Sequence, residues 1–235
     1  MPAWATLVRA DNPSPMTLEG TNTWVLVVGG QRIVVDPGPL LESHLARVAG
    51  LGPVDLVLLT HRHPDHAEGA QRFVELTGAP VLDRADFAVS GSPVTAGVDV
   101  LHTPGHTGDS VSFVVSSEDE AAALTGDTIL GRGSSVVAYP DGNLADYLNS
   151  LRQLAEVGDI AVLPGHGPVL GSARVAATAY LNHRLQRLEQ VREALAAGDR
   201  TSAQVVQRVY ADVDPVLWPA AELSVRAQLA YLGSA

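Results

Sequence analysis

The sequence predicts a mixed α/β fold followed by a smaller helical part. Up to about residue 170, short runs of β-branched and other apolar residues alternate with segments of helical spacing. Beyond that point only helical spacing remains. A chain of 235 residues suits one domain, or one domain with an appendage. We therefore predict an α/β domain over residues 1–172 and a C-terminal helical appendage over residues 173–235.

The composition excludes several classes of protein. Hydrophobic residues make up 46% of the chain and charged residues 17%, which excludes general disorder. The chain has no cysteine, so disulfides, thiolate ligands and a cysteine nucleophile are excluded. The net charge of −11 argues against a broad polyanion-binding surface. No apolar run approaches the roughly 18–20 residues that span a bilayer, and no signal peptide is visible, so we expect a cytoplasmic protein without a membrane partner.

The first half of the α/β domain begins with a hairpin. Gly29-Gly30 separates two β-rich runs, as the tight turn of a hairpin requires. A later apolar run is continuous, which is typical of a strand buried on both faces. We predict strands at 24–28, 32–36 and 55–60, and helices at 40–51 and 66–77.

The second half repeats this pattern more loosely, and a long helix follows it. We predict strands at 98–102, 111–115, 121–126 and 160–163, and helices at 144–157, 173–197 and 217–232. Thr201 and Gln204 fit a capping box that begins a short helix ending at Tyr210. The long helix carries a leucine stripe that suits either the core or a dimer face, so we expect a monomer or a homodimer. The stripe consists of Leu181, Leu185, Leu188 and Leu195.

Histidines and aspartates gather where the predicted strands end. Four of them follow the strand ending at Thr60, within the run His61-Arg62-His63-Pro64-Asp65-His66. Three more follow later strands, at His106, Asp127 and His166. Strand ends place side chains along one rim of a sheet, and seven candidate ligands exceed the four of a structural zinc. Neutral imidazole and carboxylate without thiolate suit zinc, manganese or iron. We expect two divalent metal ions, zinc first, with manganese or iron as alternatives.

The same residues resemble the metallo-β-lactamase superfamily. The resemblance covers nearly the whole chain and rests on Asp36 before Pro37-Gly38, on the histidine-rich run, and on His106, Asp127 and His166. Within the superfamily, several segments resemble the branch of β-lactamase-like protein 2, which contains an endoribonuclease acting on single strands and bacterial hydrolases of unassigned substrate. These segments are 12–23, 126–131, 163–168 and 182–184.

The resemblance implies an αββα sandwich with two metals at one edge of its sheets. It implies a short helical appendage that resembles a winged helix whose wing strands are missing. It also implies that Asp36 lies behind the ligands and orients the side of the site at His66. The implied ligands are His61, His63 and His106 for one metal, Asp65, His66 and His166 for the other, and Asp127 as the bridge.

Such a site favours hydrolysis by a hydroxide held between two metals, with Asp65 orienting the nucleophile and accepting its proton. A small ester or thioester is the first substrate class, and single-stranded RNA is the alternative. A β-lactamase is disfavoured because Asp127 and the lack of cysteine depart from that pattern, and the intact ligand set disfavours a protein without activity. We expect substrate contacts from Asn22, Arg132, Tyr139 and His183. His44 is expected to face solvent.

Overall fold

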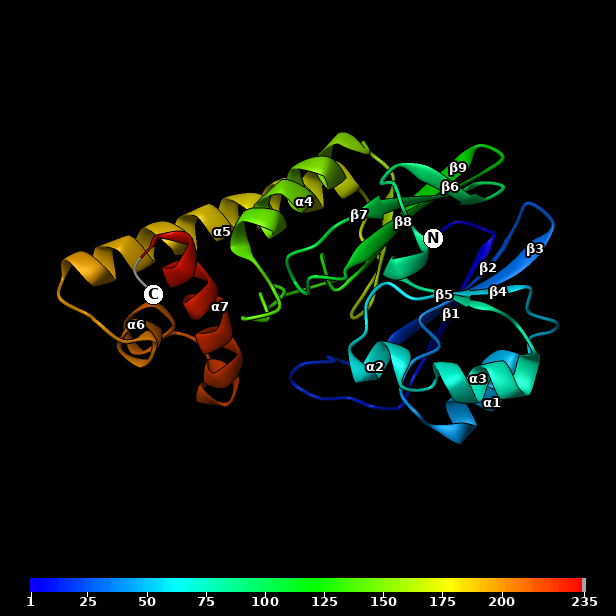
Figure 1. The fold of residues 1–235 in the computed structure, drawn as a ribbon, viewed down its shortest axis with the longest axis horizontal. Helices are drawn as coiled ribbons and strands as arrows, with labels where there is room; N and C mark the ends of the chain where they lie inside the picture. The colour runs from blue at the N-terminus through cyan, green and yellow to red at the C-terminus, as the bar shows by residue number, and fades with distance from the viewer. Residues whose placement is uncertain (234–235) are drawn as a thin grey trace.

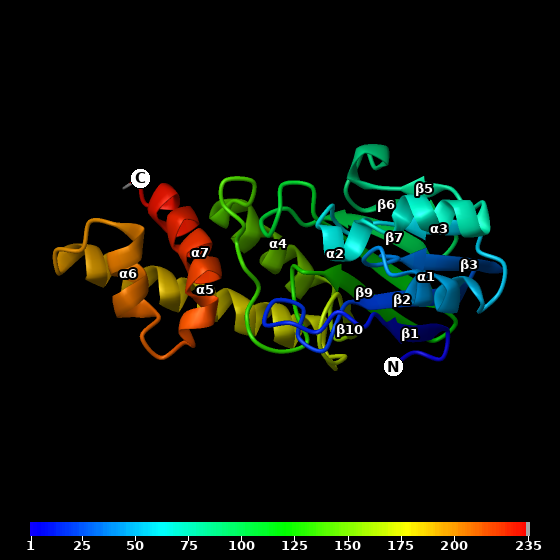
Figure 2. The same cartoon turned by 90° about the horizontal axis from the view of Figure 1, so that it is seen from below.

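Two five-stranded β-sheets lie face to face, with helices covering both outer surfaces (Figures 1 and 2). The structure, a computed structural model, describes residues 1–233. The four layers confirm the α/β class predicted from the alternating pattern and the αββα sandwich implied by the resemblance. Within the described residues, no helix combines the length and the apolar character needed to cross a membrane.

The first sheet has the strand order β1-β2-β3-β4-β5. The predicted hairpin is present, since β2 and β3 pair antiparallel on either side of Gly29-Gly30. Strands β4 and β5 then add in parallel, which requires a helical connection between successive strands. The strands are β1 (Ala5–Arg9), β2 (Asn22–Val28), β3 (Gln31–Val35), β4 (Leu56–Leu58) and β5 (Val81–Leu82).

The second sheet has the order β10-β9-β8-β7-β6. Its strands pair antiparallel except for β9 and β10, which run in parallel. Side chains such as Leu26, Leu58, Phe113 and Leu124 interdigitate between the two sheets and form the central core. The strands are β6 (Ser92–Thr95), β7 (Val98–His102), β8 (Val111–Ser117), β9 (Glu120–Gly126) and β10 (Ala161–Pro164).

Each sheet buries its outer face under its own helices. On the first sheet, Val34 and Val57 pack against Leu45 and Phe73 from two helices. On the second sheet, the outer face packs against a helix with the predicted leucine spacing. The helices of the sandwich are α1 (Glu42–Ala49), α2 (Pro64–Ala67), α3 (Ala70–Thr77), α4 (Leu144–Glu156) and the short 3₁₀ turn η1 (Arg84–Asp86).

The C-terminal helices project from one end of the sandwich (Figure 1). The predicted capping box is present, because Thr201 and Gln204 exchange hydrogen bonds at the start of the second of these helices. Between residues 173 and 233 the structure contains no strand. These elements are α5 (Ala173–Ala196), α6 (Ser202–Val209), the 3₁₀ turn η2 (Pro215–Leu217) and α7 (Trp218–Tyr231).

The helix α5 belongs to both parts of the molecule. The predicted boundary at residue 172 coincides with its N-cap, Ser172. However, Ala177 packs into the core under α4, whereas Val191 packs among α6 and α7. Within the predicted leucine stripe, Leu188 is buried and Leu185 is 43% exposed. The division into two domains stays a prediction.

The predicted helix 66–77 is wrong in one respect, since the chain breaks it into α2 and α3 at Gly69. A Cβ at Gly69 would lie 2.9 Å from the carbonyl oxygens of Gly38 and Pro39. The backbone N–H of Gly69 donates to that Gly38 oxygen, at 2.9 Å. The break therefore comes from a close approach between distant loops, which local helical spacing does not reveal.

Candidate metal centre and adjoining pocket

The candidate ligands meet at one rim of the sandwich. The run from His61 to His66 follows β4, His106 lies in the connection from β7 to β8, Asp127 directly follows β9 and His166 follows β10. All seven belong to three groups whose ligand atoms lie within 4.8 Å of one another. The structure therefore brings together every residue that the sequence proposed as a ligand.

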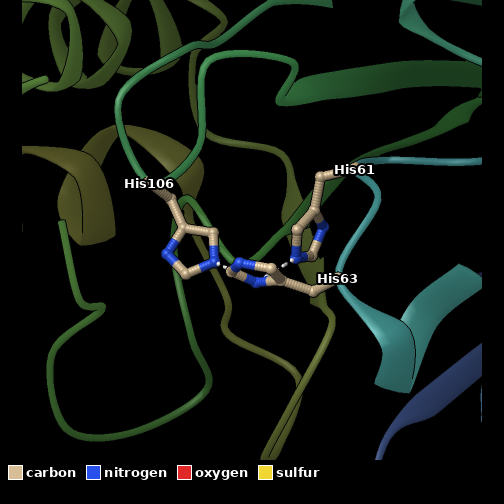
Figure 3. Close-up of side chains that lie close together, drawn as sticks. All are labelled: His61, His63 and His106. Atoms are coloured by element: carbon tan, nitrogen blue, oxygen red, sulfur yellow. Dashed lines mark hydrogen bonds between the residues drawn. The ribbon is translucent and has the colours of Figure 1, made fainter. Parts of the chain in front are cut away.

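The first group consists of His61, His63 and His106, whose ring nitrogens point toward one another (Figure 3). Nδ1 of His63 lies 3.1 Å from Nε2 of His61 and 3.0 Å from Nε2 of His106. His61 and His106 are buried, and His63 is partly exposed. Three ring nitrogens thus converge on one point at the edge of the site.

The second group consists of Asp65, His66 and His166. Nε2 of His166 lies 3.2 Å from Nε2 of His66 and 3.1 Å from Oδ2 of Asp65. The carboxylate of Asp65 is 27% exposed, against 12% for Asp127 and 3% for Asp36. Asp65 is therefore the acidic side chain of this cluster that water reaches most easily.

Asp127 lies between the two groups. Its Oδ1 is 3.4 Å from Nε2 of His66, and its Oδ2 is 3.4 Å from Nε2 of His166 and 3.8 Å from Nε2 of His106. Oδ1 is buried and has no hydrogen-bond partner. A buried carboxylate oxygen without a donor is costly, so this position suits a bound cation.

Hydrogen bonds behind the cluster fix the protons of its rings. Thr60 donates its hydroxyl to Oδ2 of Asp36 at 2.7 Å, which leaves the hydroxyl oxygen to accept from Nδ1 of His61 at 3.0 Å. Nδ1 of His66 donates to the same carboxylate at 2.8 Å. Asp36 adopts φ of +52°, a strained value that its contacts with Thr60 and His66 hold in place. Asp36 thus contacts both the residue before His61 and the ring of His66.

Two further rings, His106 and His166, follow the same rule, whereas His63 turns its Nδ1 inward. Nδ1 of His106 donates to the carbonyl of Val136 at 2.6 Å, and Nδ1 of His166 faces the carbonyl of Gly20 at 3.4 Å. A neutral ring that donates from Nδ1 presents a lone pair at Nε2. Inward nitrogens only 3.0–3.2 Å apart repel unless a proton or a cation lies between them. The donor set therefore fits metal ions.

The electrostatics of the cluster also call for positive charge. Burial acts to raise the pKa of Asp127, but the charges of His166 and His66 prevail and hold it well below its usual range. Burial acts to lower the pKa of His166, but the charge of Asp127 and hydrogen bonds to Asp127 and Asp65 raise it to about 9. Burial, together with the charge of His66, lowers the pKa of His61, as a neutral ligand requires.

Two glycines allow the loops to reach the cluster. A Cβ at Gly165 would lie 2.6 Å from Oδ1 of Asp127 and 2.6 Å from Cε1 of His66. Gly126 has φ of +48°, and a Cβ there would lie 2.5 Å from Oγ1 of Thr60. A larger residue at Gly165 would push into the space among the ligands, and one at Gly126 would push against Thr60, which hydrogen-bonds to Asp36.

A pocket of about 300 Å³ opens beside the cluster. Its wall begins at His106 and Asp127 and continues under the C-terminal helices. Most of the lining is apolar, with side chains from the loop at residues 15–18 and from α7. Three arginines, Arg132, Arg184 and Arg187, also line it.

The expected substrate contacts divide into two pairs. Arg132 and His183 line the pocket. Tyr139 lies outside that lining and borders a separate pocket next to α7. Asn22 is fully buried and donates its amide to the carbonyls of Pro164 and Gly167. The expectation of a substrate contact is therefore wrong for Asn22, which instead holds the loop that carries His166.

His44 is also placed differently from the expectation. It is 2% exposed rather than facing solvent. Its Nε2 lies 2.8 Å from Oγ1 of Thr23, and Nη2 of Arg47 faces its Nδ1 at 3.3 Å. Burial first, and then the charge of Arg47, lowers its pKa to about 4. His44 is therefore a neutral residue of the first helix layer.

Sequence reasoning left Arg187 and the apolar lining of the pocket out of the site. These residues come from the loop at 15–18 and from α5, η2 and α7, which lie far apart in the chain. The arginine spacing on the predicted long helix was the available signal, because Arg184 and Arg187 are three residues apart and share a helix face.

Family models match most of the chain. The model described as "Metallo-beta-lactamase superfamily" matches residues 16–93 and 91–166, which include all seven candidate ligands. The model described as "Beta-lactamase associated winged helix domain" matches residues 201–233, the region of α6 and α7. The second match agrees with the appendage expected from the resemblance.

Relatives cover nearly the same span. A "Beta-lactamase-like protein 2 homolog" of Drosophila melanogaster is 32% identical, over 94% of this chain and 85% of its own. An "Atrochrysone carboxyl ACP thioesterase" of Aspergillus chevalieri is 34% identical, over 88% of this chain and 73% of its own.

Solved structures share the fold. A metallo-β-lactamase family protein from Thermus thermophilus superposes with a TM-score of 0.80 at 23% identity, over 98% of this chain and 93% of that chain. TTHA1623, solved in a di-iron-bound form, superposes with a TM-score of 0.55 at 25% identity, over 73% of this chain and 96% of that chain. With the rim of histidines and aspartates, these matches show that the chain belongs to the metallo-β-lactamase superfamily and is similar to β-lactamase-like protein 2 homologues.

Proposed function

We propose that this protein is a dinuclear metal-dependent hydrolase of small acyl esters or thioesters. The observation that carries the proposal is the direct connection between the metal cluster and a pocket with mostly apolar walls. An apolar pocket suits the acyl part of a substrate, with its reacting carbon placed at the cluster. The relative from Aspergillus chevalieri that is named as a thioesterase supports this substrate class.

The two groups of ligands fit one metal ion each, with Asp127 between them. We propose His61, His63 and His106 for the first ion and Asp65, His66 and His166 for the second. Zinc is the first choice for imidazole and carboxylate ligands, and manganese or iron are alternatives. The di-iron form of TTHA1623 supports a pair of ions in this fold. When bound, two divalent ions supply Lewis acidity and lower the pKa of water toward neutrality.

Asp65 has the position of the residue that moves a proton. Burial acts to raise its pKa, but a hydrogen bond to His166 and the charge of His66 lower it, so the carboxylate is ionised. It is also the most exposed of the carboxylates in the cluster. Asp65 accepts a proton from the attacking water and returns it to the leaving sulfur or oxygen. Thioester and water then give a carboxylic acid and a thiol.

The walls of the pocket orient the substrate. Leu130 and Val136 come from the segment between β9 and α4, and Leu217 and Ala220 come from η2 and α7. Arg132 and His183 stay proposed as substrate contacts, since both line this space. These apolar surfaces also keep bulk water away from the acyl group.

Cleavage of single-stranded RNA is the second candidate, because three arginines line the same pocket. The zinc-loaded protein is tested on two kinds of substrate. Hydrolysis of a panel of thioesters is measured by the release of free thiol, and cleavage of a labelled single-stranded RNA is measured on gels. We expect thiol release that disappears in His61→Ala together with bound metal. His102→Gln, at the end of β7 outside the three ligand groups, is the matched control and keeps both. RNA cleavage with inert thioesters would reverse the order of the candidates.

A further inference from the structure

The pocket beside the metal cluster contains a buried arginine without an acidic partner. Arg184, in the middle of α5, is only 3% exposed. Among residues 1–233, no carboxylate oxygen lies within 4.0 Å of the Arg184 guanidinium, the limit for an ion pair. Burying an unpaired charge is costly, and proteins normally balance it with an opposite charge. The structure therefore leaves this guanidinium in need of an anion.

The other two arginines of the pocket are already engaged. Arg132 forms an ion pair with Glu19 at the entrance. Arg187 donates to the carbonyl of Val209 at 2.6 Å and lies 3.9 Å from the carboxylate of Asp212. Arg184 is the pocket arginine that lacks a carboxylate among the described residues.

Contacts inside the protein occupy only part of the Arg184 guanidinium. Nη2 donates to the backbone carbonyl of Ser135, and Cζ lies 5.3 Å from the ring centroid of Tyr147. Nε is buried and has no hydrogen-bond partner. A purely structural arginine would satisfy this donor as well. The ring of Tyr147 and the carbonyl of Ser135 thus hold the guanidinium in place, while part of its donor capacity has no protein partner.

Ser135 connects this arginine to the metal cluster. Its carbonyl accepts from Arg184, and its hydroxyl donates to the carbonyl of Asp127 at 2.5 Å. The same hydroxyl lies 3.3 Å from Nδ1 of His106. Arg184, Asp127 and His106 all line the pocket. A molecule that fills the pocket is therefore positioned to meet the guanidinium and the cluster at once.

We propose that Arg184 binds an acidic group of the substrate, a carboxylate or a phosphate. A guanidinium at the pocket wall suits either group, since both present anionic oxygens. This proposal rests on the proposed hydrolase function and narrows its substrate to an acyl compound that carries an acid. The acid lies either on the acyl chain, as in a dicarboxylic acid, or on the thiol, as in a phosphorylated pantetheine arm.

Two pairs of thioesters separate these sources. N-acetylcysteamine thioesters of succinic and butanoic acid differ by a carboxylate on the acyl chain. S-butanoyl phosphopantetheine and S-butanoyl pantetheine differ by a phosphate on the pantetheine arm that carries the thiol. We expect the zinc-loaded protein to prefer the acidic member of one pair. Arg184→Gln should lower kcat/KM for that member by about 10- to 100-fold, the size expected for a charged hydrogen bond, and change the neutral member by less than about threefold.

Matched variants exclude a structural cause. Arg184→Lys keeps the charge without the planar fork and should retain part of the preference. Arg192→Gln removes an exposed arginine from the same helix, outside the pocket, and should change nothing. Bound metal and circular dichroism are compared for every variant. Equal losses of kcat/KM on the acidic and the neutral substrate in Arg184→Gln would overturn the proposal. If Arg184→Gln does not fold, Arg184→Lys takes its place, and an unchanged preference for the acidic substrate in that variant would overturn the proposal.

A binding measurement separates this inference from the proposed function. Thioether analogues of the same four compounds lack the scissile carbonyl and are titrated into the zinc-loaded protein by calorimetry. We expect one acidic analogue to bind about tenfold tighter than its neutral partner, and this difference to vanish in Arg184→Gln. Such binding without thioester turnover would refute the hydrolase and keep the acid site. Turnover without any preference for an acid would keep the hydrolase and refute the acid site.

Discussion

The metal cluster and the pocket beside it are built in opposite ways. The cluster consists of polar side chains that follow strands, and hydrogen bonds behind it fix the rings of His61, His66 and His106. The pocket consists mainly of apolar side chains from helices and from the loop at residues 15–18, and Met16 there is 50% exposed. The rings of the cluster are held by hydrogen bonds, whereas the lining of the pocket is partly exposed.

This difference indicates a division of labour. Rigid strand ends hold chemistry that tolerates little displacement. In the proposed hydrolase, helices and loops form the walls that would select the substrate, and such segments vary at lower cost. Changes in the cluster should therefore abolish metal binding and activity together. Changes in the pocket should alter substrate preference while bound metal stays constant.

The largest effect is expected for Asp127→Ala, which removes the carboxylate between the two ligand groups. We expect loss of bound metal and a fall in kcat/KM of roughly a thousandfold or more, since groups that act as a unit fail together. Elemental analysis and thiol release provide the two measurements. A variant that keeps both metals and near-normal turnover would show that Asp127 is not the bridge.

A smaller loss is expected when the cluster is distorted without removing a ligand. In Gly165→Ala the added Cβ would lie 2.6 Å from Oδ1 of Asp127 and from Cε1 of His66. We expect about a 10- to 100-fold loss of metal affinity, the range for changes that reorient ligands. Gly171→Ala, where a Cβ meets nothing within 4 Å, is the matched control. Equal metal affinities in the two variants would contradict the geometry.

The pocket is tested by filling it from α7. Ala220→Phe introduces a ring into the lining, which Leu217 shares. We expect long acyl thioesters to lose about tenfold in kcat/KM, because one or two displaced methylenes account for such a factor. Acetyl thioesters and bound metal should change little. If both substrates lose activity equally, the pocket does not hold the acyl group.

The smallest effect concerns His44, which belongs to neither region. The pKa of His44 in the folded protein is about 4, below its usual 6.5. As the pH falls, His44 is therefore protonated in the unfolded chain before it is protonated in the folded protein. The stability that this neutral residue contributes is present above pH 6.5 and is lost as the pH falls toward 4. The loss is at most about 3 kcal/mol. Urea unfolding between pH 7 and 4 should show a flatter pH dependence in His44→Gln, and equal slopes would contradict the assignment.

The sequence alone was sufficient to propose the ligands. His61, His63, Asp65 and His66 are close together in the chain, and the remaining three follow recognisable strands. Parallel pairing of β9 with β10 and of β3 with β4 then brings those ends together, because such strands point to a common edge. Local sequence patterns predict these ligands because each ligand follows a strand, and the ends of the strands lie together at one edge of the sheets.

Other features depend on contacts that no local pattern carries. Asn22 looked like a substrate contact, but its partners Pro164 and Gly167 lie most of the chain away. The break at Gly69 arises from a loop around Gly38. The pocket joins residue 15 to residue 224, so its lining is decided by how the helices pack. Long-range packing, rather than propensity, determines these three features.

The length of α5 links the two regions mechanically. Its 24 residues form one uninterrupted rod of about 36 Å, anchored at one end beside α4 and at the other among α6 and α7. Each added residue would turn the distal half by about 100°. A single insertion before Arg184 would therefore swing the guanidinium and the entire α6–α7 wall out of alignment, although the ligating rim would stay untouched. The number of residues in α5 therefore fixes how the pocket wall is placed relative to the candidate metal ligands.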